Sequence, residues 1–115
     1  MREPNPVTEA SMEEFDRFYR INVLGTMHCV KTVGAAMCQQ APLTVQGRTG
    51  ERNVGRGAIV NLGSANSYIA TRDMVQATAS KHAVLGITRN AGPFSPLDLI
   101  TFYPTLLPSS LVDFH

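Results

Sequence analysis

The chain has 115 residues, of which 43% are hydrophobic and 17% are charged, and its formal net charge at pH 7 is +1. This length allows one small domain, and a charge so close to zero gives no electrostatic basis for binding nucleic acid or an anionic membrane surface. No apolar run approaches the length that crosses a bilayer and no secretory signal is visible, so we expect a cytoplasmic protein.

Residues 1–10 contain two prolines and predict an extended lead-in. Ser11, followed three residues later by Glu14, has the pattern of a capping box and predicts the start of a helix. Apolar residues then recur at steps of three or four, which predicts one long helix over residues 11–39. Its apolar stripe consists of Met12, Phe15, Tyr19, Val23, Met27, Val30, Val33 and Met37.

The two cysteines of the chain, Cys29 and Cys38, both fall on this predicted helix. They do not combine with further cysteine or histidine residues into a motif with metal-ligand spacing, so they predict no metal site. In a cytosolic protein, we interpret them as two reduced and buried thiols.

Residues 41–57 show no periodicity. Their sequence includes "QGRTGERNVGRG", with four glycines and three arginines, which predicts a solvated loop. The arginines could hold a phosphate group, but the Gly-Lys-Ser/Thr ending of a phosphate-binding loop is missing. The segment is therefore interpreted as a connection without a ligand.

The next segment, "AIVNL" over residues 58–62, is short, rich in β-branched residues and almost continuously apolar. This pattern is typical of a strand that is buried on both faces, as in a parallel sheet. Gly63 and Ser64 end the predicted strand, and residues 67–72 form a connecting loop.

A second helix is predicted over residues 73–90, with Asp73 as its N-cap. Two sets of residues follow the helical period on different sides of it. The first set is Ala77, Lys81, Val84, Leu85 and Thr88, and the second is a stripe of small residues, Ala79, Ala83 and Gly86, which would let another backbone approach closely.

Residues 92–115 hold four of the seven prolines, at positions 93, 96, 104 and 108. Proline at this density forbids a long helix and a central strand. The segment is apolar but has no secondary-structure period, so we expect a poorly ordered tail.

The order of a long helix, a buried strand that ends in serine, and a helix with a lysine resembles the short-chain dehydrogenase/reductase family. The resemblance is carried by "INVLGTMHCV" from Ile21, "GAIVNLGSANS" from Gly57 and "ASKHAVLGITRNA" from Ala79, and it covers residues 11–91. It implies an α/β chain with a partial Rossmann-type fold. It also implies an NAD(P)-dependent oxidoreductase ancestry, with hydride transfer to or from a small carbonyl or alcohol.

In that family the catalytic set is Asn, Ser, Tyr and Lys, and by motif position Asn22, Ser64 and Lys81 match three of the four. The resemblance implies that Asn22 holds a water in the proton relay, that Ser64 polarises the carbonyl, and that Lys81 binds the nicotinamide ribose of NAD or NADP. The Tyr position, four residues before Lys81, is occupied by Ala77. A methyl group neither donates nor accepts a proton. Tyr68 follows Ser64 in a loop and is not one turn from Lys81.

The Gly-x-Gly-x-x-Gly turn that holds the cofactor pyrophosphate does not occur in these 115 residues. We therefore expect the nucleotide-binding half to be absent and the chain to be an inactive, truncated pseudoenzyme. Taken singly, Asn22, Ser64 and Lys81 also have ordinary interpretations, as a polar residue beside the stripe, a turn residue and a surface lysine.

Two alternatives to the interpretation as an inactive enzyme relative stay open. The first is an interaction module, because in this family the two retained helices, 11–39 and 73–90, usually build the subunit interface. Such a module would pair with itself or with an intact relative. The second is a fragment of a longer reading frame with no stable fold of its own. The sequence does not identify the substrate.

Overall fold

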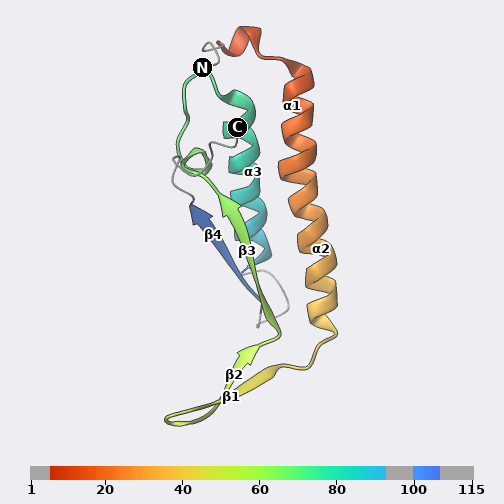
Figure 1. Ribbon diagram of the computed structural model, residues 1–115, viewed down its shortest axis with the longest axis vertical. Helices are drawn as coiled ribbons and strands as arrows, with labels where there is room; N and C mark the ends of the chain where they lie inside the picture. Colours follow the sequence, from red (N-terminus) through yellow and green to blue (C-terminus); the bar gives the residue numbers. More distant parts are fainter. Residues whose placement is uncertain (1–5, 93–99, 107–115) are drawn as a thin grey trace, which may run out of the picture.

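The computed structural model describes residues 6–92 and, for the backbone alone, residues 100–106. The molecule is elongated, with principal dimensions of 58 × 27 × 25 Å. A short 3-10 turn at Val7–Glu9 precedes a long helical stretch, an antiparallel hairpin, a first parallel strand, one further helix and a second parallel strand (Figure 1). The hairpin lies at the opposite end of the molecule from the start of the long helix.

The long helical stretch has three parts: α1 (Met12–Phe18), a π-helical segment η2 (Tyr19–Leu24) and α2 (Gly25–Cys38). It begins where the capping pattern predicts, since the Ser11 hydroxyl accepts a hydrogen bond from the Glu14 backbone N–H at 3.2 Å. It ends close to the predicted place as well. The long helix predicted over residues 11–39 is therefore confirmed as one continuous, though not purely α-helical, element from Met12 to Cys38.

The predicted apolar stripe on this helix is only partly buried. Val23 and Val30 are buried, whereas Tyr19 and Met27 are 45% and 47% exposed. A π-helical turn bonds residue i to i+5 rather than i+4, so it rotates the residues after it relative to those before it. One straight stripe at α-helical spacing therefore cannot stay against the same neighbour along the whole stretch.

The prediction of two buried thiols is wrong for Cys29, whose side chain is exposed. Cys38 is half-buried, and its thiol donates a hydrogen bond to the Gly34 carbonyl oxygen at 2.9 Å. Across residues 6–92, no three His, Cys, Asp or Glu side chains come together in a group that could hold a metal ion. Within the same described residues, no helix is both long enough and apolar enough to cross a membrane.

The segment predicted as an irregular loop is instead a two-stranded antiparallel hairpin, β1 (Leu43–Gly47) and β2 (Gly50–Gly55). Arg48 and Thr49 make its two-residue turn, and Gly50 has the positive φ of 119° that favours glycine. Nearly all of its residues are exposed, so no buried face imposes the alternating hydrophobic pattern by which a strand is usually recognised. This explains why its strands were not predicted.

The predicted strand is confirmed as β3 (Gly57–Gly63), and it pairs in parallel with β4 (Ile100–Leu106). The expectation of a tail without regular structure is therefore wrong for residues 100–106. Pro104 lies opposite Asn61 in a strand that pairs with β3 alone among the described residues, and such an edge position is where a sheet tolerates proline. The rest of the predicted tail after Gly92 lies outside the described residues.

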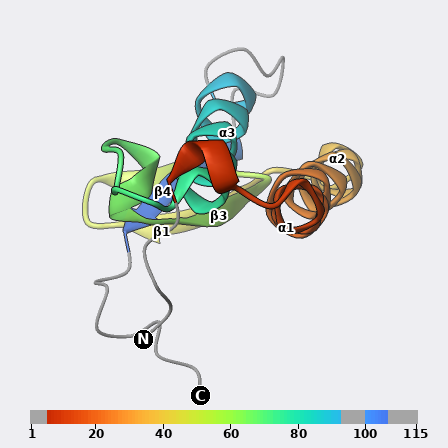
Figure 2. The ribbon, with the colours of Figure 1, turned by 90° about the horizontal axis from the view of Figure 1, so that it is seen from above.

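Helix α3 (Val75–Ala91) lies over one face of this two-stranded sheet, and the long helix runs alongside α3 (Figures 1 and 2). The opposite face of β3 is open among the described residues, since Val60 and Leu62 are 55% and 54% exposed. The prediction of a strand buried on both faces is therefore wrong here, because only one layer of helix covers the sheet.

The start of α3 also differs from the prediction. Asp73 is not the N-cap, because its φ of 60° places it in the left-handed region, and its carboxylate lies 3.3 Å from the Arg72 guanidinium. Met74 occupies the cap position and makes no side-chain capping bond. The apolar side of the helix is placed as predicted. Its Val84 and Leu85 are buried, and with Val23 and Val30 of the long helix they are the four buried apolar side chains of the residues that the structure describes.

Candidate functional site

Lys81 lies on α3 and reaches back to the end of β3. Its Nζ donates a hydrogen bond to the Leu62 carbonyl oxygen at 3.1 Å, one residue before the strand ends at Gly63. The side chain is half-buried, and this desolvation lowers the pKa of the Lys81 ammonium below its ordinary value of 10.5. The lysine predicted from the sequence therefore sits at the carboxyl end of a parallel strand, where ligands of open α/β sheets bind.

Ala77 lies one helical turn before Lys81 on the same side of α3, as the i, i+4 spacing requires. Its side chain is a methyl group, and its backbone carbonyl accepts a hydrogen bond from the Ser80 hydroxyl at 3.0 Å. The turn therefore offers no phenol to a substrate oxygen beside Lys81.

Tyr68 does not replace the missing tyrosine. Its ring lies under the Arg89 guanidinium, with 5.6 Å between the guanidinium carbon and the ring centroid. Arg89 follows Ala77 by twelve residues, which corresponds to about 18 Å along a helix axis. The ring is therefore held against a side chain that belongs to a later part of α3 than the position that the general acid would occupy.

Ser64 is placed immediately after β3 and caps a 3-10 turn, η3 (Ala65–Ser67). Its hydroxyl accepts a hydrogen bond from the Asn66 backbone N–H at 3.3 Å, and its own backbone N–H donates to the Ser67 hydroxyl at 3.1 Å. Asn66 in turn accepts a hydrogen bond from the Thr71 hydroxyl. These bonds fix Ser64 at the strand end but also use its hydroxyl as a turn cap.

Asn22 lies in the π-helical segment, and its side-chain amide donates a hydrogen bond to the Ser80 hydroxyl at 3.1 Å. Since Ser80 precedes Lys81, this bond joins the long helix to the helix that carries the lysine. Ser80 is 3% exposed, so the contact is shielded from water. The π-helical turn is the local feature that positions Asn22, and such turns are frequent at functional sites.

The structure thus brings Asn22 close to Lys81 through Ser80, and Lys81 close to the strand end that precedes Ser64. Within the described residues, no hydrogen bond joins Asn22, Ser64 and Lys81 directly to one another. Sequence reasoning did not single out Ser80. It could have been noticed because this serine is next to Lys81 and falls on the side of α3 that faces the long helix.

A second polar link between β3 and α3 was also missed. Asn61 donates a hydrogen bond from its side-chain amide to the Thr88 hydroxyl at 2.9 Å, and that hydroxyl donates to the Val84 carbonyl at 2.8 Å. The sequence feature that could have indicated this link is Asn61, the single polar side chain in an otherwise apolar strand. The link fixes how α3 lies on the strand and hence where Lys81 meets Leu62.

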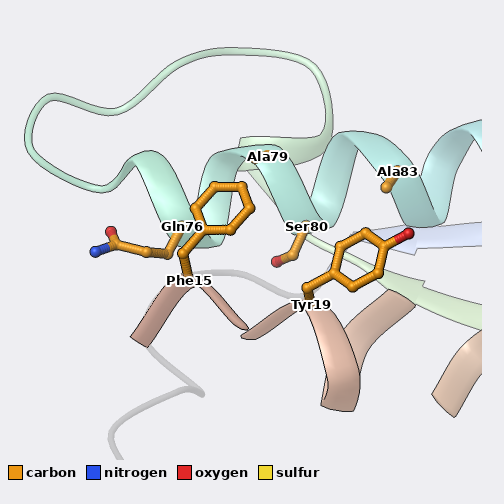
Figure 3. Close-up of a pocket in the computed structure, with 6 residues that line it drawn as sticks. All are labelled: Phe15, Tyr19, Gln76, Ala79, Ser80 and Ala83. Carbon is orange, nitrogen blue, oxygen red and sulfur yellow. The ribbon is translucent and has the colours of Figure 1, made fainter. Parts of the chain in front are cut away.

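A shallow pocket of about 130 Å³ lies between the long helix and α3 (Figure 3). The rings of Phe15 and Tyr19 face α3 across it, next to the small side chains of Ala79 and Ala83. The predicted small-residue stripe therefore borders an open apolar space. Gly86, the third member of the stripe, is exposed and lies outside this pocket.

The fold and the order of these residues define an α/β protein with part of a Rossmann-type sheet. A sequence model described as short chain dehydrogenase matches residues 1–93, which is most of the chain. The chain therefore belongs to the short-chain dehydrogenase family, whose members typically use NAD or NADP. The resemblance drawn from the sequence is confirmed at the level of the family.

Similar proteins include short-chain dehydrogenase anuF of Penicillium roqueforti, 48% identical over 86 residues, which are 75% of this chain and 31% of that protein. Short-chain dehydrogenase srdC of Neurospora crassa is 47% identical over 87 residues, 76% of this chain and 32% of that protein. A 2,5-dichloro-2,5-cyclohexadiene-1,4-diol dehydrogenase of Sphingobium indicum is 33% identical over 86 residues, which are 75% of this chain and 29% of that protein. The chain thus spans about a third of the length of the curated relatives it matches.

Proposed function

We propose that this 115-residue chain is an inactive relative of the NAD(P)-dependent oxidoreductases, which keeps the lysine of the catalytic helix but lacks its proton donor. The observation that carries the proposal is the alanine at position 77, one turn before Lys81. In the family that position holds the tyrosine that exchanges a proton with the substrate oxygen. Loss of a positioned general acid costs roughly 10² to 10⁴ in rate.

The residues that remain fit one end of a nicotinamide cofactor. The Lys81 ammonium has donors for a ribose hydroxyl, and in the proposed ancestral site Asn22 and Ser64 would have served the proton relay and the carbonyl oxygen. The 115 residues contain no Gly-x-Gly-x-x-Gly turn for the pyrophosphate. The chain therefore does not fit the whole cofactor.

The proposal is tested by titrating the purified chain with NADPH, by fluorescence, and by following NADPH absorbance in the presence of small aldehydes and ketones. We expect no binding in the micromolar range and no oxidation of NADPH above the buffer rate. A circular dichroism melt on the same sample shows whether folded protein was assayed. Micromolar binding together with carbonyl reduction would overturn the proposal.

A second candidate function is association through the two helices, either with another copy of the chain or with an intact relative. The pocket between the long helix and α3 favours it, since an apolar space lies open there beside the exposed Tyr19 side chain. A partner helix could bury this surface, with Ala79 and Ala83 allowing close approach.

Replacing Ala83 by arginine is expected to abolish such association, because a charged side chain would then fill the pocket. Sedimentation velocity over a range of concentrations measures the effect. The matched control is Ala36→Arg, which places the same side chain at an exposed position of α2 outside the pocket. A chain that sediments as a monomer at every concentration, or an Ala83→Arg variant that associates like the parent, counts against this second function.

A further inference from the structure

The pocket between the long helix and α3 exists because large side chains of one helix face small side chains of the other. Phe15 and Tyr19 are four residues apart, so both rings lie on one side of the long helix. On α3, positions 76, 79, 80 and 83 follow the helical period and share the side that faces these rings. Ala79 and Ala83 add only methyl groups there. The two helices therefore leave a space of about 130 Å³ between them (Figure 3).

The size and the walls of this pocket suit one flat ring. An apolar cavity of about 150 Å³ holds a benzene molecule, so the space between the helices is close to the size of a single six-membered ring. Aromatic pairs prefer offset-stacked or edge-to-face contacts, which stabilise them beyond the area that they bury. A flat ring makes such contacts with Phe15 and Tyr19, whereas a saturated, puckered ring of the same size does not.

One buried hydroxyl group gives the pocket a polar preference. Ser80 lines the pocket and is 3% exposed. Its hydroxyl donates its hydrogen to the Ala77 carbonyl oxygen at 3.0 Å and accepts a hydrogen bond from the Asn22 amide at 3.1 Å. A hydroxyl has one hydrogen and two lone pairs, so one lone pair of Ser80 Oγ has no partner among the described residues. The group can therefore accept a hydrogen bond from a ligand, but it has no hydrogen left to donate.

The lining of the pocket favours a neutral ligand. None of the six described residues that line it carries a charge. The amide of Gln76 and the hydroxyl of Tyr19 are the other polar groups, and they belong to opposite ends of the pocket (Figure 3). A charged ligand would lose its hydration here without gaining an opposite charge. An uncharged ring with one hydrogen-bond donor meets each of these conditions.

We propose that this pocket is a binding site for a small neutral phenol, whose ring packs against Phe15 and Tyr19 and whose O–H donates to Ser80 Oγ. The site lies where α3 faces the long helix, whereas Lys81 of the same helix contacts the end of β3. The inference therefore goes beyond the proposed loss of dehydrogenase activity and rests on neither proposed function. Association of a partner helix through this pocket would instead leave no room for the phenol.

The test titrates the isotope-labelled parent chain with phenol and with cyclohexanol and follows the backbone amide signals by NMR. A ligand of one ring in an open pocket is expected to bind with a Kd of about 1 mM. Phenol should shift the amides of residues 79–83 and leave those of the hairpin at 43–55 unchanged. Cyclohexanol has the hydroxyl without the flat ring and should bind about twofold to tenfold more weakly.

The amide map of the parent chain tests the site without any variant. Absence of phenol binding, shifts that spread over the whole chain, or equal affinity for cyclohexanol would each overturn the proposal. A chain whose spectrum is that of an unfolded polypeptide has no pocket and would overturn it as well.

The variant Ala83→Leu tests whether the space between the helices is the site. Its larger side chain takes the volume of the ring, so phenol binding should weaken by at least about tenfold. The matched control is Ala36→Leu, at an exposed position of α2 outside the pocket, which should bind phenol like the parent. Equal affinities of the two variants would contradict the proposal.

The variant Ser80→Ala tests the hydrogen bond. Phenol binding should weaken about twofold to tenfold, the usual contribution of one hydrogen bond. Fluorobenzene has a flat ring without a donor, so its affinity should be the same for this variant and for the parent. Unchanged fluorobenzene binding also shows that the pocket keeps its shape without the contact between Ser80 and Asn22. An equal loss for both ligands, or no loss for phenol, would overturn the proposal, because the Ser80 hydroxyl would then not receive the phenol.

Discussion

Replacing Ala77 by tyrosine in the 115-residue chain is expected to leave dehydrogenase activity at the level of the buffer control. The substitution restores a hydroxyl one turn before Lys81, but it supplies no glycine-rich turn for the cofactor pyrophosphate. The measurement is NADPH oxidation with small aldehydes, together with circular dichroism to show that the variant keeps its helices. Turnover above background would show that this chain binds the cofactor by another route.

The same substitution should have a large effect where the missing parts are supplied. In a chimera, residues 11–91 would replace the matching segment of the Penicillium roqueforti relative, which the chain resembles at 48% identity. Ala77→Tyr in the chimera is expected to raise the rate of carbonyl reduction by roughly 10² to 10⁴, the usual contribution of a positioned general acid. The matched control is Ala77→Phe, which adds the ring without the hydroxyl and should stay inactive.

A chimera that is already fully active with alanine at this position would contradict the proposed function. It would mean that another group donates the proton. Tyr68 is an unsuitable donor because its ring is stacked under the guanidinium of Arg89, which follows Ala77 by twelve residues on α3. Removing it by Tyr68→Phe in the active chimera would distinguish this route from a water-mediated one.

The parts of the fold that could be predicted from sequence are those in which local chemistry and burial agree. The Ser11 hydroxyl accepts a hydrogen bond from a backbone N–H of the first turn and caps the start of a helix, and the apolar run at residues 58–62 has the composition of a parallel strand. The hairpin at 43–55 has no buried face, so it leaves no hydrophobic period to detect. Its register instead depends on the two-residue turn and on the glycines around it.

The start of α3 shows a different reason for error. Asp73 is among the favoured N-cap residues, but its left-handed φ of 60° aims its side chain at Arg72 rather than at the first turn. The backbone path of the preceding loop decides this, and residue preference alone does not encode it. The π-helical segment is likewise not predictable in this way. It departs from the α-helical period, and apolar residues at steps of three or four do not reveal such a departure.

For the candidate site, motif positions predicted which residues matter but not how they are held. Lys81 reaches a backbone oxygen of β3, and Asn22 reaches Ser80, across 19 and 58 residues of sequence respectively. Both bonds depend on how α3 packs between the strand and the long helix. Such long-range pairings follow from tertiary packing, which no pattern within a single helix specifies.

The packing that holds these hydrogen bonds in place rests on few buried apolar side chains. Among the described residues only Val23, Val30, Val84 and Leu85 form the buried apolar core. An equal number of polar side chains is buried in the same described residues, and one face of β3 is open. A core this small means that each large side chain in it carries a substantial share of the stability. Leu85 is the largest of the four.

Leu85→Ala is therefore expected to destabilise the chain by about 2–5 kcal/mol, the range for a buried leucine replaced by alanine. Typical domains have only about 5–15 kcal/mol of total stability, so the variant should lose its cooperative thermal transition or melt far below the parent. The measurement is a thermal melt followed by circular dichroism, with limited proteolysis at room temperature as a second readout. The loss of packing on α3 would also release Lys81 from the strand end.

The matched control is Leu24→Ala, which removes the same atoms from a side chain that is 42% exposed in the π-helical segment. Its effect should stay within about 0.5 kcal/mol, as for surface substitutions. If both variants melt like the parent, the core does not hold the chain together. If the parent itself shows no cooperative transition and no protected segment, the alternative of a fragment without a stable fold is correct. A steep parent transition that Leu85→Ala abolishes and Leu24→Ala preserves would establish that the helix carrying Lys81 is held by this core.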